Sequence, residues 1–198
     1  EMPPLPYEFR VLRSEDVLAF SLPGGMVYVS LGLLRLCETE GHFTAALAHE
    51  LAHQQLGHSL AQWRRKVNRN RGERYILNFD GPWRANFLGE AGALWLGKGP
   101  EEEADKLGPV ILYRGGIDPR LYGAYLQLLK KMETAQPARI AILAGLHPPL
   151  AERMAWAKQA TLSLPPLKDA DISSQTFRQI KSILHEAAKR GGEKERKQ

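Results

Sequence analysis

The chain has 198 residues, of which 43% are apolar and 25% charged, the ordinary balance of a globular protein with a sizeable core. A single cysteine, Cys37, excludes an internal disulfide, and no apolar run reaches the roughly 20 residues needed to span a bilayer. Residues 64–71 and 189–198 carry much of the +5 net charge without aromatic residues interleaved for base stacking. We therefore expect no nucleic-acid partner, although basic runs of this kind also suit peripheral association with an anionic membrane surface.

The first thirty residues predict a small β-sheet, and the rest of the chain predicts helices. Strands are expected over residues 9–13, 17–20 and 26–30, with a turn at Pro23-Gly24-Gly25. Helices are expected over residues 31–38, 43–58, 100–114, 118–134, 137–145, 149–160 and 173–190. The fold class is therefore α+β and mostly helical, with one domain over residues 1–190 and a disordered basic tail over 191–198.

Residues 64–99 do not fit this pattern of helices. A basic run is followed there by a stretch rich in glycine and aromatic residues, which includes Trp83, Phe87 and Trp95. Long connections of this kind are usually functional or mobile. We interpret the segment as a lid over a cleft, and an ordinary surface loop is the alternative.

The chemistry is concentrated in the run His49-Glu50-Leu51-Ala52-His53. On a helix, residues four apart lie on one face, so the two imidazoles can bind a single zinc ion. Glu50 lies beside that face and can accept a proton from water at the metal. The continuing helix would turn His58 away from the metal, so we interpret His58 as a packing or capping residue.

A catalytic zinc needs a third protein ligand. A metzincin would have a third histidine at position 59, where this chain has Ser59. The ligand is therefore expected from the next acidic helix, where Glu101 and Asp105 lie four residues apart on one face. We assign Glu101 to the metal and Asp105 to a hydrogen bond with the far nitrogen of a ligand histidine. Acidic residues that merely favour the start of a helix are the alternative.

Five motifs in order make the chain resemble peptidase family M48, over about residues 8–160. They are Ala19 to Gly25 with Val27-Tyr28-Val29, Ala48 to His53 with Gly57-His58, Glu101 to Gly108, Gly116-Ile117-Asp118-Pro119, and His147-Pro148 with Arg153. The resemblance implies a zincin-like (gluzincin) metalloprotease domain that holds one zinc ion per chain and hydrolyses polypeptides. It implies the branch without a multi-helix membrane portion, acting in protein quality control in the bacterial periplasm or cell envelope after export by a signal that precedes this chain.

The same resemblance extends the site beyond the metal ligands. His147 is expected near the metal, where it either stabilises an oxyanion or occupies the open coordination position and keeps the enzyme latent; the alternative is that His147-Pro148 only caps and starts a helix. Substrate is expected to pair with the strand Met26–Ser30, with Val27 along it and with Gly24 and Gly25 permitting close backbone approach. A plain hairpin turn is the alternative reason for the two glycines. Arg153 is expected to contact the substrate or to form a structural ion pair. The alternatives to a peptidase are a zinc-bearing chaperone or adaptor that does not cleave and a zinc hydrolase acting on another bond.

Overall fold

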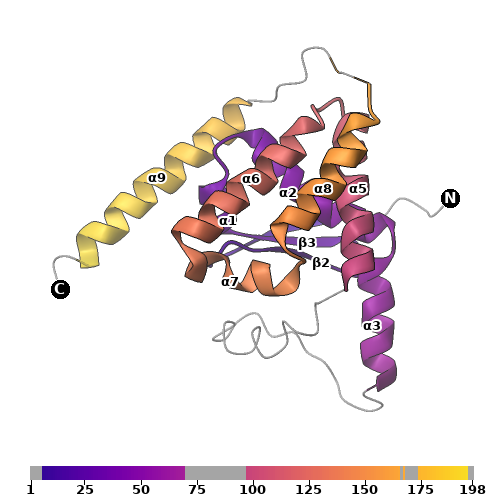
Figure 1. Cartoon of the computed structure of the whole chain (residues 1–198). Helices are drawn as coiled ribbons and strands as arrows, with labels where there is room; N and C mark the ends of the chain where they lie inside the picture. The colour runs from indigo at the N-terminus through magenta and orange to yellow at the C-terminus, as the bar shows by residue number, and fades with distance from the viewer. Residues whose placement is uncertain (1–5, 70–96, 166, 168–173, 196–198) are drawn as a thin grey trace.

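A computed structural model describes residues 6–69, 97–165, 167 and 174–195 (Figure 1). Three short strands, β1 (Glu8–Leu12), β2 (Ala19–Leu22) and β3 (Met26–Ser30), form one sheet in the order β1-β3-β2. β3 lies in the middle, parallel to β1 and antiparallel to β2. The three strands follow the predicted order along the chain, with starts displaced by up to two residues.

The remaining elements are helices, which confirms the predicted α+β, mostly helical fold. They are α1 (Leu31–Leu36), α2 (Glu40–Gln55), α3 (His58–Arg69), α5 (Lys98–Arg114), α6 (Arg120–Ala135), α7 (Pro137–Leu146), α8 (Leu150–Leu162) and α9 (Gln175–Glu195). Within the described part of the chain, no helix combines the length and the apolar character that a bilayer crossing requires.

Helix α2 is the centre of the fold. It packs against α5 and α6 on one side and against β2 on the other. The main core joins these helices to α8 through buried residues such as Leu112, Leu126 and Ala157. A smaller cluster of Leu18, Phe20, Leu22, Tyr28, Ile142 and Leu146 attaches the sheet to α7. The end of α7 is thereby fixed beside β2, at the mouth of the cleft described below.

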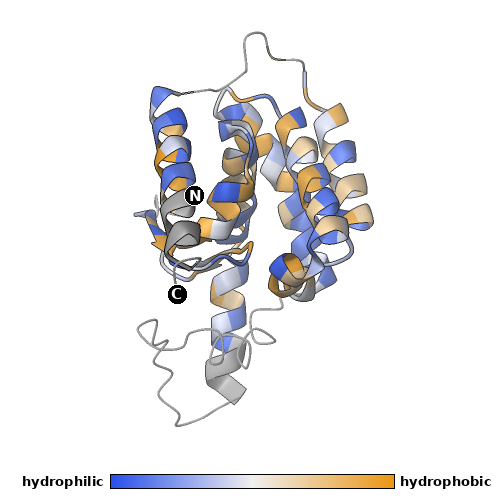
Figure 2. Ribbon diagram, turned by 90° about the vertical axis from the view of Figure 1, so that its left-hand side faces the viewer, coloured by the Kyte–Doolittle hydropathy of each residue, from blue (hydrophilic) through white to orange (hydrophobic). Residues whose placement is uncertain are grey.

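Helix α2 ends earlier than predicted. It stops at Gln55, and Gly57 follows with a φ of +72°, a conformation that glycine adopts at little cost. The chain then turns at Gly57 into α3, which occupies residues 64–69 of the segment predicted to be a lid. In both views α3 projects away from the body (Figure 1, Figure 2). Residues 70–96, the rest of the predicted lid, lie outside the described part.

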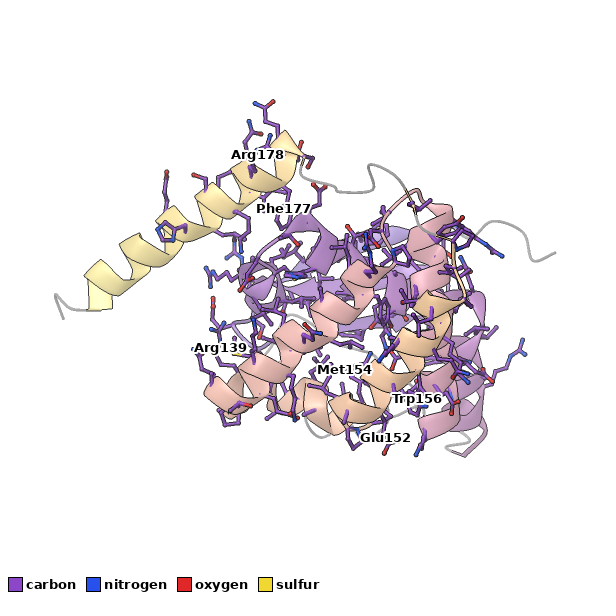
Figure 3. All side chains as sticks on the ribbon, turned by 45° about the horizontal axis from the view of Figure 1, so that its top comes forward. Arg139, Glu152, Met154, Trp156, Phe177 and Arg178 are labelled. Atoms are coloured by element: carbon purple, nitrogen blue, oxygen red, sulfur yellow. The ribbon has the colours of Figure 1, made fainter. Side chains whose placement is uncertain are left out.

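Helix α9 is attached to the body by its first turns. Phe177 is buried against the ring of Phe43, with the ring centres 6.3 Å apart, and Figure 3 shows its position on α9 next to the exposed Arg178. Lys181 donates hydrogen bonds to the carbonyl oxygens of Leu34 and Arg35 at the end of α1. The helix continues to Glu195, five residues beyond its predicted end at residue 190.

Candidate metal centre

The two motif histidines lie on the buried face of α2. Thr39 caps the helix by accepting a hydrogen bond from the backbone N–H of His42, which fixes where the helical periodicity begins. His49 and His53 are 3% and 2% exposed, and their Nε2 atoms lie 3.1 Å apart. Such close, desolvated ring nitrogens are energetically unfavourable unless a shared partner lies between them.

Helix α5 supplies the carboxylate. Glu101, only 1% exposed, places Oε2 3.5 Å from His49 Nε2 and Oε1 3.5 Å from His53 Nε2. A tetrahedral zinc ion with bonds of about 2.0–2.1 Å has ligand atoms roughly 3.3–3.4 Å apart. The three observed separations, 3.1–3.5 Å, are close to this spacing, with one carboxylate oxygen of Glu101 facing each histidine. These side chains fit a zinc ion in both chemistry and spacing.

A buried network holds the far side of His49. Its Nδ1 lies 3.1 Å from Asp105 Oδ1 and 2.9 Å from the hydroxyl of Tyr122, which itself donates to Asp105 over 2.7 Å. Arg153 donates two further hydrogen bonds to Asp105, both 2.8 Å long. Because the Tyr122 proton goes to Asp105, the Nδ1–H of His49 points into this network and Nε2 is left to face Glu101 and His53. Asp105 thus makes the contact that the sequence predicted.

Glycine and proline in α5 bring this network together. A Cβ on Gly108 would overlap the ring of Tyr122, so only glycine lets Tyr122 approach α5 closely enough to reach Asp105. Pro109 lies inside the helix. It removes the N–H that would bond the Asp105 carbonyl four residues earlier, a position where helices commonly kink.

Burial and neighbouring charges set the ionisation of the cluster. For Asp105, burial favours the neutral acid, but the Arg153 guanidinium outweighs it and holds the pKa well below its usual range. Burial raises the pKa of Glu101 less than His147 and His49 lower it, so Glu101 is also ionised. Burial and the His49 charge hold the pKa of His53 well below its ordinary value.

His49 differs from His53 in its ionisation. Burial and Arg153 lower the pKa of His49, but its contacts with Asp105 and Glu101 raise it by more, to about 9. Without a cation, His49 therefore holds a proton between two carboxylates. A zinc ion would replace that proton, because only a neutral imidazole binds a metal.

His53 has an orienting partner that the sequence analysis missed. Its Nδ1 lies 3.0 Å from His58 Nδ1, and His58 Nε2 lies 2.9 Å from Glu103 Oε2. The prediction that His58 faces away from the metal is wrong, because α2 ends at Gln55 and the turn at Gly57 brings His58 back. Gly57, directly before His58, was the signal in the sequence, because glycine commonly follows the end of a helix.

Glu50 lies in a cleft beside the two histidines. The cleft spans about 370 Å³ and is open to solvent, and its walls come from β2, α2, α3, α5, the end of α7 and the residue after it. Its lining residues are Ala19, Phe20, Ser21, Glu50, His53, Ser59, Gln62, Glu101, Leu146 and His147. Burial raises the pKa of Glu50, partly offset by His49 and His147, which moves this carboxyl toward the range of a general base.

His147 reaches the same cluster from the end of α7. Its Nδ1 lies 2.6 Å from Glu101 Oε2, and one ligand atom from each of His49, Glu101 and His147 lies within 4.8 Å of the others. A cation at this site could therefore be held by two, three or four of the side chains His49, His53, Glu101 and His147.

Comparison with known proteins identifies the group to which this site belongs. The profile of peptidase family M48 matches residues 1–161. The chain belongs to this family. It is 32% identical over 163 residues to the mitochondrial metalloendopeptidase OMA1 of Schizosaccharomyces pombe, covering 77% of this chain and 46% of that protein. It is 24% identical to the beta-barrel assembly-enhancing protease of Yersinia pestis, covering 90% of this chain and 39% of that protein. It is also 24% identical to the beta-barrel assembly-enhancing protease of Escherichia coli K12, covering 82% of this chain and 36% of that protein.

Membership in peptidase family M48 agrees with a zincin-like fold and a metal-dependent site, and the chain spans less than half the length of these relatives. One expectation drawn from the resemblance to that family needs correction. The strand Met26–Ser30 cannot accept a substrate, because β1 and β2 occupy both of its edges, and Val27 on it is fully buried. Of the two roles expected for Arg153, the structure shows the ion pair, because its side chain is 2% exposed and its guanidinium is bound to Asp105.

The two glycines of the β2–β3 turn lie in different surroundings. Gly24 and Gly25 have φ values of +94° and +91°, which makes the turn itself the reason for glycine at both positions. A Cβ on Gly25 would lie 2.6 Å from the carbonyl oxygen of Pro6, so the close backbone approach there is made by the chain's own N-terminal segment. Neither glycine lines the cleft that contains Glu50.

Proposed function

We propose that this chain is the catalytic domain of a zinc-dependent endopeptidase. The observation that carries the proposal is the convergence of His49, His53 and Glu101 at the separations of a zinc tetrahedron, with Glu50 in the adjoining cleft. The single zinc ion would be held by these three side chains. Membership in a metallopeptidase family whose relatives include metalloendopeptidases supports the same chemistry.

Zinc in such a site acts as a Lewis acid that polarises the scissile carbonyl and makes water acidic enough to attack near neutral pH. The chain's own residues supply the rest. Glu50, with its pKa raised by burial, accepts the proton of the attacking water and passes it to the amine that leaves. The network of Asp105, Tyr122 and Arg153 keeps His49 in the tautomer whose Nε2 faces the cluster.

We propose that an extended substrate lies along β2 rather than β3. Among the described strands, β2 forms the edge of the sheet next to the cleft, and three of its residues line that cleft together with Glu50. Gln54, buried on α2 next to His53, donates to the carbonyl of Leu22 over 2.5 Å and holds the end of β2 against the metal helix. Pairing of a peptide with β2 would therefore place its backbone at a fixed distance from the metal ligands.

We further propose a role in protein quality control at the bacterial envelope, in the periplasm or at a membrane surface. The similarity to beta-barrel assembly-enhancing proteases supports this role, and the polypeptide substrate would then be a poorly assembled envelope protein. A second candidate is a latent or non-cleaving zinc protein that acts as a chaperone or adaptor. The contact of His147 with Glu101 favours it, because a histidine in that place can fill the position that catalysis needs open.

Hydrolysis of unfolded casein tests the proposal. The zinc-loaded chain should cleave casein, a chelator should stop cleavage, and added zinc should restore it. Glu50→Gln should keep its zinc and lose cleavage by about 10²–10⁴-fold, the usual contribution of a general base. Proteolysis that survives either the chelator or Glu50→Gln would remove this mechanism. His147→Ala would increase cleavage if His147 keeps the enzyme latent, and decrease it if His147 stabilises an oxyanion.

A further inference from the structure

We infer that His58 and Glu103 are positioning residues for the metal ligand His53. They extend from a carboxylate that is 63% exposed at the surface to an imidazole that is 2% exposed at the metal centre. The links are His58 Nε2 to Glu103 Oε2, 2.9 Å, and His58 Nδ1 to His53 Nδ1, 3.0 Å. His58 is itself buried, so its ring has few other orientations available. The inference rests on the metal site of the proposed function and adds two residues to it.

The two hydrogen bonds that link Glu103, His58 and His53 determine which ring nitrogens carry a proton. An ionised carboxylate only accepts hydrogen bonds, so the proton of the first link belongs to His58 Nε2. A neutral His58 then has a lone pair on Nδ1, and the proton of the second link must belong to His53 Nδ1. His53 is therefore left with a lone pair on Nε2, the atom that lies 3.5 Å from Glu101 Oε1. Glu103 thus selects the metal-binding tautomer of His53 through His58.

Two helices must meet for this arrangement to form. Gly57, at a φ of +72°, turns the chain so that the first residue of α3 lies under the last turns of α2. On α5, Glu103 is two residues from both Glu101 and Asp105, which places it about 200° around the helix from either. Glu101 and Asp105 face α2, and Glu103 reaches α3. One turn of α5 therefore contacts both ligand histidines through Glu101 and also reaches His53 indirectly, through Glu103 and His58.

The two ligand histidines have different kinds of support. The partners of His49 are Asp105, Tyr122 and Arg153, each no more than 2% exposed. The hydrogen bonds that orient His53 run instead through His58 to Glu103, whose carboxylate is exposed to solvent. Glu103 is therefore the one of these groups that can be changed without opening the core, which makes it the better position for a test.

Zinc affinity, measured by competition with a chelating indicator, tests the inference independently of proteolysis. Glu103→Ala should weaken zinc binding about 10–100-fold, the usual effect of losing such a partner. Glu102→Ala is the matched control, because it removes the same charge from the same helix turn, where Glu102 pairs with Lys106 over 2.6 Å. His58→Phe should weaken binding at least as much as Glu103→Ala. His58→Gln, whose amide can both accept and donate, should recover part of the loss.

A purely structural role predicts a different pattern. It would lower the thermal stability of the metal-free variants and leave their zinc affinity equal to that of Glu102→Ala. Equal zinc affinities for Glu103→Ala and Glu102→Ala would overturn the inference, as would wild-type affinity in His58→Phe. Absence of casein hydrolysis by the wild-type chain would count against the proposed function only, since zinc binding is measured without a substrate.

Discussion

Arg153→Met offers the most direct test of the buried network behind the metal site. Arg153 and Asp105 are 2% and 0% exposed and share two hydrogen bonds of 2.8 Å. Methionine fills much of the same volume but leaves the Asp105 carboxylate buried without its counter-charge. Breaking a buried ion pair in this way costs about 3–5 kcal/mol. For a chain of this length the melting temperature should fall by roughly 6–20 °C.

Urea unfolding followed by circular dichroism, with a chelator present to remove any stabilisation by metal, measures this cost. Arg153 holds the pKa of Asp105 low in the folded state, so their interaction contributes stability above the unfolded pKa of about 3.9. That contribution decreases as the pH falls below this value toward the lower folded pKa. The difference in stability between wild type and Arg153→Met should therefore be full at pH 7 and smaller at pH 3.

The double variant Asp105→Leu/Arg153→Met separates stability from metal binding. Replacing both members of a buried ion pair by apolar residues is often close to neutral, so the double variant should regain most of the lost stability. Its zinc affinity should stay about 10–100-fold below wild type, because His49 has lost its carboxylate partner. A loss below about 1 kcal/mol in Arg153→Met at pH 7 would refute the reasoning, because it would mean that Asp105 is neutral or solvated.

Three further predictions concern residues that build the metal site and a residue that attaches α9 to the rest of the protein. Gly108→Ala should cost about 1–3 kcal/mol in urea unfolding, because the new Cβ overlaps the ring of Tyr122; an unchanged midpoint would show that Tyr122 is not held there. Glu101→Gln should weaken zinc binding more than Glu103→Ala does in the same indicator assay, and the reverse order would contradict the assignment of Glu101 as a ligand. Lys181→Met should cost about 1–3 kcal/mol and speed amide exchange in α9, because it removes two hydrogen bonds to the end of α1; unchanged exchange would mean that Phe177 alone holds the helix.

The sequence predicted those parts of the site that depend on spacing along one helix. His49 and His53, and likewise Glu101 and Asp105, are four residues apart, so a helix brings each pair to one face wherever it packs. The positions of the helices followed from apolar periodicity and from glycine and proline at their ends. Glu103 shows the limit of that reasoning, because nothing in the sequence of α5 indicates that α3 would lie within its reach.

The order of the strands could not be predicted from the sequence. All three strands are short and rich in β-formers, and a turn between residues 22 and 26 indicates only that β2 and β3 are neighbours. The parallel pairing of β1 with β3 depends on a contact between residues that are 18 apart in the register. The central strand was consequently mistaken for the edge that faces the cleft. His58 was misplaced for a similar reason, because the left-handed conformation of Gly57 ends α2 and changes the direction of the chain.

X-ray absorption at the zinc edge, combined with metal analysis, tests the central claim most directly. We expect one zinc per chain, with four nitrogen or oxygen neighbours at about 2.0–2.1 Å and the scattering pattern of two or three imidazoles. His53→Ala should lose one imidazole from that pattern and bind zinc more weakly. A sulfur neighbour, a six-coordinate shell or a spectrum unchanged in His53→Ala would contradict the claim that His49, His53 and Glu101 hold the metal.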